Sequence, residues 1–393
     1  MIKYEEALKI VLEKAVFKGQ EEVLLENACG RVLAEDIEAD IDMPLFNKSR
    51  MDGFACRRED LMQELEVIDT VYAGEVSDEI VTTGTCIRIM TGAPVPAGAD
   101  CVIMVEETKT LKDDTIVFTG VKTDDNISFK GEDFKIGDIL LSKGKILKPH
   151  HIAILATAGR AKVKVALRPR VALLVTGNEL SSFSEKPKDG HIRDSNTPQL
   201  KAQIEEMGAD LTFCSHIGDK LESTISAIAK AKDVSDLILL SGGVSMGEYD
   251  FVPKAIEALG GLILIEKVAV KPGKPSKFAA FEKSCCLGLP GNPVSSFVQF
   301  EILAKPFLYK LMGCDYKPLE ASFILAEDFR RKENKRKEWY PVKIINHKMI
   351  KPLKQQSSGD IASLAEADGL MIIEQGISEI AKGSEINVRL LRS

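Results

Sequence analysis

The clearest indication of the fold of this chain is the stretch Leu237-Ile-Leu-Leu-Ser-Gly-Gly-Val-Ser-Met-Gly-Glu-Tyr-Asp250. Its first four residues form an apolar run that is typical of a strand buried in a parallel sheet. The turn that begins at Ser241 contains three glycines and two serines, which let an anion approach the backbone closely. Ligands of open α/β sheets lie beyond the carboxyl ends of the strands. The turn and Asp250 therefore predict a phosphate site beside a metal or an acid–base group.

The sequence around this stretch alternates between strands and helices. Thr197-Pro198 has the residue types of a helix start, an N-cap followed by proline, and this helix would run toward Gly208. The pattern predicts further helices at 221–232, 253–259 and about 293–312, and strands at 171–175, 237–240, 262–265 and 285–289. This order is typical of an α/β domain with a mostly parallel sheet.

The flanking regions have different patterns. Apolar residues recur at helical spacing within 3–17, and helical character returns from Pro149 to Gly159. The Gly- and Pro-rich region between them predicts a small β domain, with β-type runs at 87–90, 101–105 and 116–118. After Gly313, a terminal β domain is predicted by short apolar runs at 323–325, 340–342, 370–373 and 386–388.

The composition indicates a multidomain globular protein. The chain has 393 residues, 45% hydrophobic and 28% charged, and this length predicts two to four domains. With a net charge of −7, the chain lacks the broad positive field that is typical of a nucleic-acid-binding protein. No apolar run reaches transmembrane length, and Lys3, Glu5 and Glu6 do not fit a signal peptide. The eight cysteines show no C-x-x-C spacing, so we expect buried free thiols in a reducing cytoplasm.

Three turns follow the buried strands of the α/β segment: Thr176-Gly-Asn-Glu179, Ser241-Gly-Gly-Val-Ser245 and Pro290-Gly-Asn-Pro-Val-Ser295. In a parallel sheet all three lie at the carboxyl edge, so we expect them to converge on one pocket. A single glycine-rich turn is more often only a turn. Three at corresponding strand ends favour a binding site.

Four acidic residues are expected along this edge: Glu179, Asp194, Asp219 and Asp250. Carboxylates with few competing thiols or imidazoles suit Mg²⁺ better than Zn²⁺. The alternative for each is solvation or helix capping, and Asp194 with Ser195 is placed to cap the helix that follows.

Lysines gather in the segment Lys267-Val-Ala-Val-Lys-Pro-Gly-Lys274. On an extended strand, Lys267 and Lys271 point to the same side because their separation is even. With Lys274 they would form an anion clamp in an otherwise acidic protein, and the alternative is a solvated strand edge. The G-x-x-x-x-G-K-[ST] frame of a P-loop is absent.

Three loops of the N-terminal half add polar residues. Asp52 precedes a glycine, Thr91–Asp100 is dense in turn residues, and Gly131-Glu-Asp133 adds two acids. Physically these are loops with special backbone angles and no defined chemistry.

Together the motifs resemble the MoeA family, the molybdopterin molybdenumtransferases, which also include the E domain of gephyrin. Seven segments match in the family's order, within residues 44–295: Ser49-x-Met-Asp-Gly-Phe-Ala55, Met90-Thr-Gly-Ala-Pro-x-Pro-x-Gly-Ala-Asp100, Gly131-Glu-Asp133, Thr176-Gly-Asn-Glu-Leu180, Ser241-Gly-Gly-Val-Ser-x-Gly-x-x-Asp250, Lys271-Pro-Gly-Lys-Pro275 and Pro290-Gly-Asn-Pro-Val-Ser295. Seven motifs in one order are far more specific than any one of them.

The resemblance implies an elongated homodimer of four-part subunits. These parts are a helical linker domain (1–43 plus 141–166), an inserted β domain (44–140), an adenylyltransferase-like, molybdopterin-binding α/β domain (167–314) and a C-terminal β-barrel (315–393). The active cleft would lie between the α/β domain of one subunit and the inserted β domain of its partner.

The implied reaction is Mg²⁺-dependent insertion of molybdenum, from molybdate, into adenylylated molybdopterin with release of AMP. Cleaving a phosphoanhydride needs a metal and cations to offset the developing charge. The resemblance assigns catalytic roles to Asp52, Glu179, Asp219, Asp250, Lys267 and Lys271, and among these it assigns Mg²⁺ binding to Glu179, Asp219 and Asp250. It assigns substrate binding to Thr91, Asp133, Ser241, Gly242, Gly243, Ser245, Lys274, Pro290, Pro293 and Ser295.

One departure and three alternatives accompany the resemblance. Many relatives carry arginines just before Gly-Glu-Asp, where this chain has Ser128-Phe-Lys130. Part of the anion contact is then missing or is supplied by Lys130. The alternatives are a tungstate-specific paralogue, a molybdopterin adenylyltransferase and a gephyrin-like scaffold. The adenylyltransferase does not require Asp52 or Thr91, and a scaffold has no need of the acids and lysines.

Overall fold

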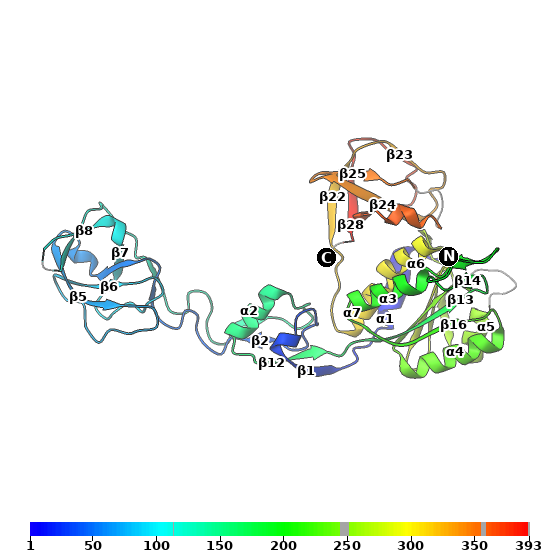
Figure 1. The fold of residues 1–393 in the computed structure, drawn as a ribbon, viewed down its shortest axis with the longest axis horizontal. Coiled ribbons are helices and arrows are strands. Elements are labelled where there is room, and N and C mark those ends of the chain that lie inside the picture. The colour runs from blue at the N-terminus through cyan, green and yellow to red at the C-terminus, as the bar shows by residue number, and fades with distance from the viewer. Residues whose placement is uncertain (113, 244–250, 355–358, 392–393) are drawn as a thin grey trace. The chain divides into compact units, whose positions relative to one another are not determined.

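The computed structural model describes residues 1–393 apart from 113, 244–250, 355–358 and 392–393 (Figure 1). The chain divides into two compact units. The first unit comprises Met1–Glu35, Lys143–Lys148 and Lys162–Ser393, and the second comprises Asp36–Ser142 and Pro149–Ala161. The four-part division implied by the family resemblance is finer than this and stays a prediction.

A six-stranded sheet forms the centre of the first unit. Its order is β16 (Asp210–Ile217), β13 (Arg170–Thr176), β17 (Leu237–Ser241), β21 (Cys285–Leu289), β20 (Lys277–Ala280) and β18 (Leu262–Ile265). The first four strands are parallel, and β20 runs antiparallel to both of its neighbours. The four strands predicted from apolar runs are present, whereas β16 and β20 were not predicted.

Helices cover both faces of this sheet because both faces of its central strands are apolar. Val171, Leu173 and Val175 of β13 pack into one hydrophobic cluster, whereas Ala172 and Leu174 pack into another, as strand periodicity requires. The first cluster includes residues of α1 (Tyr4–Glu13), α3 (Asn196–Glu206), α6 (Pro293–Gln299) and α7 (Lys305–Leu311). The second includes residues of α4 (Leu221–Val234) and α5 (Val252–Ala258).

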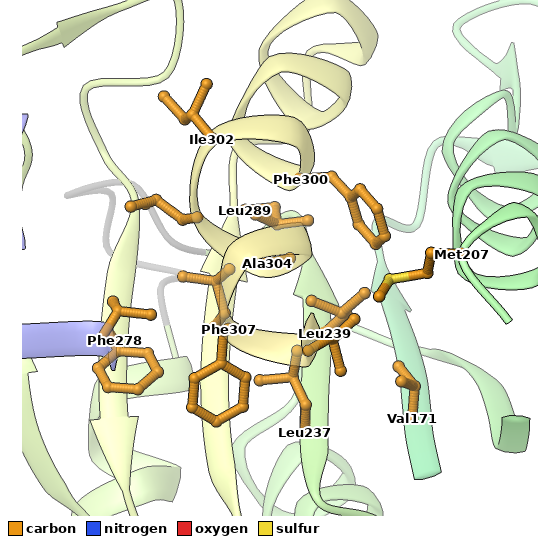
Figure 2. Close-up of a cluster of buried hydrophobic side chains, with 14 of the residues drawn as sticks. Val171, Met207, Leu237, Leu239, Phe278, Leu289, Phe300, Ile302, Ala304 and Phe307 are labelled. Carbon is orange, nitrogen blue, oxygen red and sulfur yellow. The ribbon is translucent and has the colours of Figure 1, made fainter. Parts of the chain in front are cut away.

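The helix predicted at about 293–312 is a continuous helical stretch with a π segment, Phe300–Ala304, between α6 and α7. Pro306 explains the irregularity, because proline lacks the N–H that would bond the carbonyl four residues earlier. Figure 2 shows Phe300 and Phe307 of this stretch among the side chains of the sheet, and the rings of Phe307 and Phe278 meet edge to face at 5.9 Å.

A closed five-stranded barrel follows in the C-terminal region, as predicted. Its strands are β24 (Lys337–Asn346), β25 (Met349–Pro352), β22 (Glu320–Leu325), β28 (Glu385–Leu390) and β26 (Gly369–Ile373), which pairs again with β24. The short strand β19 (Val270–Lys271) pairs in parallel with the start of β24, so the lysine segment contacts the barrel directly. Two further short strands, β23 (Phe329–Arg330) and β27 (Glu379–Ile380), pair beside it.

The remaining strands of the first unit pair outside the two large sheets. β1 (Gln20–Leu24) pairs antiparallel with β12 (Lys162–Ala166), which joins the two segments that flank the second unit in sequence. β14 (Leu180–Ser181) pairs in parallel with β15 (Ile192–Arg193).

The second unit contains a mixed sheet in the order β7 (Cys101–Met104), β4 (Gly53–Cys56), β6 (Thr85–Ile89), β5 (Glu64–Val71), β9 (Thr115–Phe118) and β8 (Thr108–Thr110). Two short pairs, β2 (Ile37–Glu38) with β11 (Ile139–Leu141) and β3 (Lys48–Ser49) with β10 (Ile127–Ser128), and helix α2 (Pro149–Thr157) complete it. Strands β6, β7 and β9 overlap the three predicted β-type runs. Across the described parts of both units, no helix has the length and apolar character needed to cross a membrane.

Candidate active site at the carboxyl edge of the sheet

Three turns meet at the carboxyl edge of the α/β sheet, as the strand order predicts. The N–H of Gly242 donates to the carbonyl of Leu289, at 3.1 Å, which ties the second turn to the end of β21. A Cβ placed on Gly242 would lie 2.7 Å from the carbonyl oxygen of Thr176, and one on Gly291 would lie 3.7 Å from the Cα of Gly242. The described parts of the three turns therefore form one cluster.

The second turn needs glycine at two consecutive positions. Gly242 and Gly243 have φ angles of 88° and 61°, in the left-handed region that favours glycine. A Cβ on Gly243 would lie only 3.0 Å from Thr176 Oγ1, so space and backbone angle exclude a side chain at both positions. A backbone without side chains is what an anion needs for close approach.

Asn196, which the sequence did not indicate, clamps the second and third turns together. Its Nδ2 donates to Ser241 Oγ at 2.8 Å and to the carbonyl of Gly291 at 2.7 Å. Because the Gly291 carbonyl can only accept, these contacts fix which end of the amide is nitrogen. Asn196 and Ser241 are both buried, and Asn196 Oδ1 has no hydrogen-bond partner among the described residues.

Two of the predicted metal ligands lie on adjoining turns. The Asn178 N–H donates to Asp219 Oδ2 at 3.2 Å, and the Asp219 N–H donates to Asn178 Oδ1 at 3.4 Å. The Glu179 carboxylate lies over Gly177, where an added Cβ would be 2.8 Å from either oxygen. Glu179 is exposed and Asp219 half-buried, so both offer carboxylate oxygens near the surface. The third predicted ligand, Asp250, and the predicted phosphate contact Ser245 lie outside the described residues.

This donor set fits a hard cation such as Mg²⁺, which prefers oxygen ligands and keeps several waters. The described residues contain no cluster of three or more histidine, cysteine or acidic side chains that could hold a metal by themselves.

Asp194 has a structural task instead. It accepts from the N–H of Thr197 at 3.0 Å and from Thr197 Oγ1 at 2.5 Å, so it caps the first turn of α3. The capping alternative thus holds for Asp194. The predicted N-cap is corrected from Thr197 to Ser195, and the helix begins at Asn196 instead of Pro198.

The prediction that Lys267 and Lys271 share a face assumed one extended strand. This assumption was wrong, because the chain bends at Ala269 between the two lysines. The chain bends at Glu266 and at Ala269, and between these bends Val268 forms an isolated parallel bridge with Ile2. The Ile2 N–H donates to the Lys267 carbonyl at 3.1 Å, and the Ala269 N–H donates to the Ile2 carbonyl at 2.7 Å.

The buried residue Gln299 stabilises the turn between Lys271 and Lys274 through two hydrogen bonds. Its Nε2 donates to the carbonyl of Pro272 at 3.0 Å, and its Oε1 accepts from Ser276 Oγ at 2.9 Å. Lys274 is exposed at the end of this turn, whereas Lys271 forms an ion pair at 2.9 Å with Glu338 of the barrel. Gln299 therefore links this turn to the helix that begins at Pro293.

The predicted residues of the third turn lie at its junction with that helix. Pro290 is buried directly after β21, Pro293 is the first residue of α6, and Ser295 is buried in the first helical turn.

In the second unit, Asp52 and Thr91 form a close pair. Asp52 Oδ1 accepts from the N–H of Thr91 at 2.6 Å and from Thr91 Oγ1 at 2.7 Å. These two hydrogen bonds hold the pKa of the exposed Asp52 below its ordinary value. The predicted Asp133 is also exposed, and its N–H donates to the carbonyl of Met43 at 2.9 Å.

Comparison with known proteins identifies the family. Three family models match in chain order: the MoeA N-terminal region (domain I and II) over residues 2–159, a probable molybdopterin binding domain over 172–310, and the MoeA C-terminal region (domain IV) over 323–391. A molybdopterin molybdenumtransferase from Staphylococcus epidermidis is 36% identical over 405 residues, which cover 100% of this chain and 96% of that protein. The chain belongs to the MoeA family.

Further relatives of the MoeA family agree over the full length. A molybdopterin molybdenumtransferase from Staphylococcus aureus is 34% identical over 403 residues, covering 100% of this chain and 96% of that protein. The crystal structure of the molybdopterin biosynthesis moeA protein from Pyrococcus horikoshii OT3 is 32% identical with a TM-score of 0.86, covering 99% of this chain and 100% of that one. Family membership places this chain among transferases of molybdenum cofactor biosynthesis.

Two cations in and beside the stretch Ser128-Phe-Lys130 are paired with carboxylates. Arg50 Nε donates to Ser128 Oγ at 3.0 Å, and Arg50 also forms an ion pair with Glu132. Lys130, the expected substitute, lies 3.6 Å from Asp42 and is itself paired, and Phe129 is exposed. Arg50 therefore places a guanidinium beside the stretch where the family resemblance led us to expect arginines.

Proposed function

We propose that this MoeA-family chain inserts molybdenum, from molybdate, into adenylylated molybdopterin and releases AMP. The observation that carries the proposal is the convergence of Thr176, Ser241–Gly243 and Gly291 at one sheet edge, where two left-handed glycines leave the backbone without side chains. Such a backbone accommodates a phosphate, and the family supplies the pterin as the substrate class.

The cofactor of the proposed reaction is Mg²⁺, which would offset the charge that develops when the anhydride is cleaved. Glu179 and Asp219 would hold it through their carboxylates, and Asp250 is proposed as the third ligand. The positions of Glu179 and Asp219 favour this assignment, because both carboxylates are accessible and belong to adjoining turns.

Cations and turn residues would hold the anionic groups. Lys267, Lys271 and Lys274 would bind the phosphates or molybdate. Ser241 fixes the phosphate turn through Asn196, and Ser245 is proposed to contact the phosphate. The residues proposed to border the molybdate pocket are Pro290, Pro293 and Ser295.

The second unit would complete the cleft from the partner subunit of a homodimer in the cytoplasm. Asp52, whose pKa is lowered by the hydrogen bonds from Thr91, would supply a negative charge held in place by Thr91, and Asp133 would contact the substrate.

The direct test is to incubate the protein with adenylylated molybdopterin, Mg²⁺ and either molybdate or tungstate, and to measure AMP and metal-loaded pterin. We expect both products with molybdate, and the tungstate arm tests for a tungstate-specific enzyme. Failure to form either product with either oxyanion would refute the function. Asp250→Asn should slow AMP release, and a wild-type rate would refute the assignment of Asp250.

The shared cleft has its own test. Mixing Asp52→Ala with Asp250→Ala subunits should restore part of the activity, because a heterodimer keeps one intact cleft. Confirmed subunit exchange without recovery would contradict a cleft built from two subunits.

A further inference from the structure

One buried carboxylate, that of Glu338, connects the C-terminal barrel to the lysine turn, the turn between Lys271 and Lys274. In the β19–β24 pair, Lys271 lies opposite Glu338, and Glu338 Oε1 is 2.9 Å from Lys271 Nζ. The side chain of Glu338 is only 2% exposed, whereas that of Lys271 is 40% exposed. The ammonium of Lys271 is therefore held on one side by the barrel and open on the other.

Arg331 fixes Glu338 from its other side. Arg331 Nη1 lies 3.0 Å from Glu338 Oε2, and the side chain of Arg331 is 3% exposed. The remaining guanidinium donors bond to the carbonyls of Ile377, Arg336 and Glu374, at 2.6, 3.0 and 2.6 Å. These hydrogen bonds of Arg331 all go to residues 336–377 of the C-terminal region, so they hold the Glu338 carboxylate within that region.

We propose that Glu338 is a positioning residue of the active site, through which the C-terminal barrel orients Lys271 toward the anionic substrate. The inference rests on the proposed anion-binding role of Lys271. Stability alone explains this arrangement poorly, since a buried ion pair contributes little net stability relative to apolar side chains. A carboxylate at this place fixes the direction of the ammonium, and it also offsets one of the positive charges that attract an anion.

This role predicts that turnover and anion affinity change in different ways. Glu338→Gln keeps the size of the side chain but removes its charge. We expect kcat for AMP release to fall by at least about tenfold, because the lysine loses its fixed direction. The affinity for molybdate, measured by calorimetry with molybdate alone, should stay equal or increase because a nearby negative charge is gone.

Glu320→Gln is the matched control. Glu320 belongs to the same barrel and pairs with Arg389 at 3.1 Å, whereas the ion pair of Lys271 is with Glu338. Its replacement should leave kcat near the wild-type value. Equal losses of kcat in Glu338→Gln and Glu320→Gln would overturn the inference. If Glu338→Gln does not fold, Glu338→Asp takes its place. It keeps the negative charge but moves the carboxylate away from Lys271, and its kcat is compared with that of Glu320→Gln in the same way.

A double variant separates positioning from general stability. If Glu338 acts through Lys271, Lys271→Ala combined with Glu338→Gln should be as slow as Lys271→Ala alone. Losses that multiply would show that Glu338 acts independently of Lys271 and would overturn the inference. A wild-type rate for Lys271→Ala would instead refute the role given to Lys271 in the proposed function.

Discussion

Asn196→Ala should impair the enzyme more than its effect on stability alone explains. The substitution removes two hydrogen bonds of 2.8 and 2.7 Å that join the second and third turns. At about 1 kcal/mol each the loss approaches about 2 kcal/mol, and removal of the unpaired Oδ1 returns part of it. A net loss of about 1–2 kcal/mol corresponds to a roughly 5–30-fold increase in local opening.

Two measurements follow from this estimate. Hydrogen exchange at Gly242, whose N–H bonds to Leu289, should speed up by that factor. The rate of AMP release should fall further, by up to about 100-fold, because a displacement of about 1 Å in a substrate-holding group can cost that much.

Gln203→Ala is the control for Asn196→Ala. Gln203 is a buried amide of the same helix, but it donates to Glu301 at 2.9 Å and not to either turn. It should lose comparable stability and retain its turnover. If the two variants slow AMP release equally at equal loss of stability, Asn196 contributes only to packing and the reasoning fails.

Three further perturbations test other parts of the site. Thr91→Val removes a donor at 2.7 Å from Asp52, so the pKa of Asp52 should rise toward its ordinary value in an NMR titration, and an unchanged pKa would contradict the geometry. Because the pKa of Asp52 is lowered in the folded state, its ionised form stabilises the fold above its ordinary pKa, and this stabilisation is lost as the pH falls through the folded-state pKa. Titration of Asp52 should therefore cause no change in activity near neutral pH. Asp219→Asn and Glu179→Gln should each raise the Mg²⁺ concentration for half-maximal AMP release by at least about tenfold, while Asp194→Asn, which alters only a helix cap, should not. Gly273→Ala places a Cβ 2.4 Å from Gln299 Nε2 at a φ of 103°, and it should lower the free energy of unfolding in urea by about 2–3 kcal/mol. The control Gly376→Ala has a φ of 93° and no atom within 4 Å, so it should lower that free energy by only about 1 kcal/mol. Equal losses in the two variants would exclude the clash with Gln299.

The central parallel strands β17 and β21 could be predicted because they lie in apolar runs. Every residue of β17 and β21 is buried, so each appears in the sequence as an uninterrupted apolar run followed by a turn. The edge strand β16 was missed because only one of its faces is covered, and its residues accordingly alternate in exposure. Alternation over eight residues that include Thr212, Ser215 and His216 gives a much weaker signal.

The turns could be predicted for a different reason. Their glycines and prolines are demanded by local backbone geometry, which leaves a mark at each position in the sequence. The residues that hold the turns in place show no comparable pattern in the sequence. Asn196 contacts Gly291, Gln299 contacts Pro272, and Glu338 contacts Lys271, so each partner lies at least 27 positions from the residue it holds. In the sequence, these three residues look like ordinary polar positions of a helix or a strand.

The lysine turn shows why these hidden partners matter for function. Lysine side chains are long and flexible, so a cluster of them attracts anions without fixing where an anion lies. Here the backbone of the segment bonds to Ile2, its turn rests on Gln299, and the ammonium of Lys271 is paired with Glu338. Three segments distant in sequence thus restrain the lysine segment 267–274. Specificity for the geometry of the bound anion would then depend on these buried contacts, while the lysines supply the charge. Substitutions at Gln299 or Glu338 should therefore alter turnover through position, and substitutions at Lys274 should alter binding through charge.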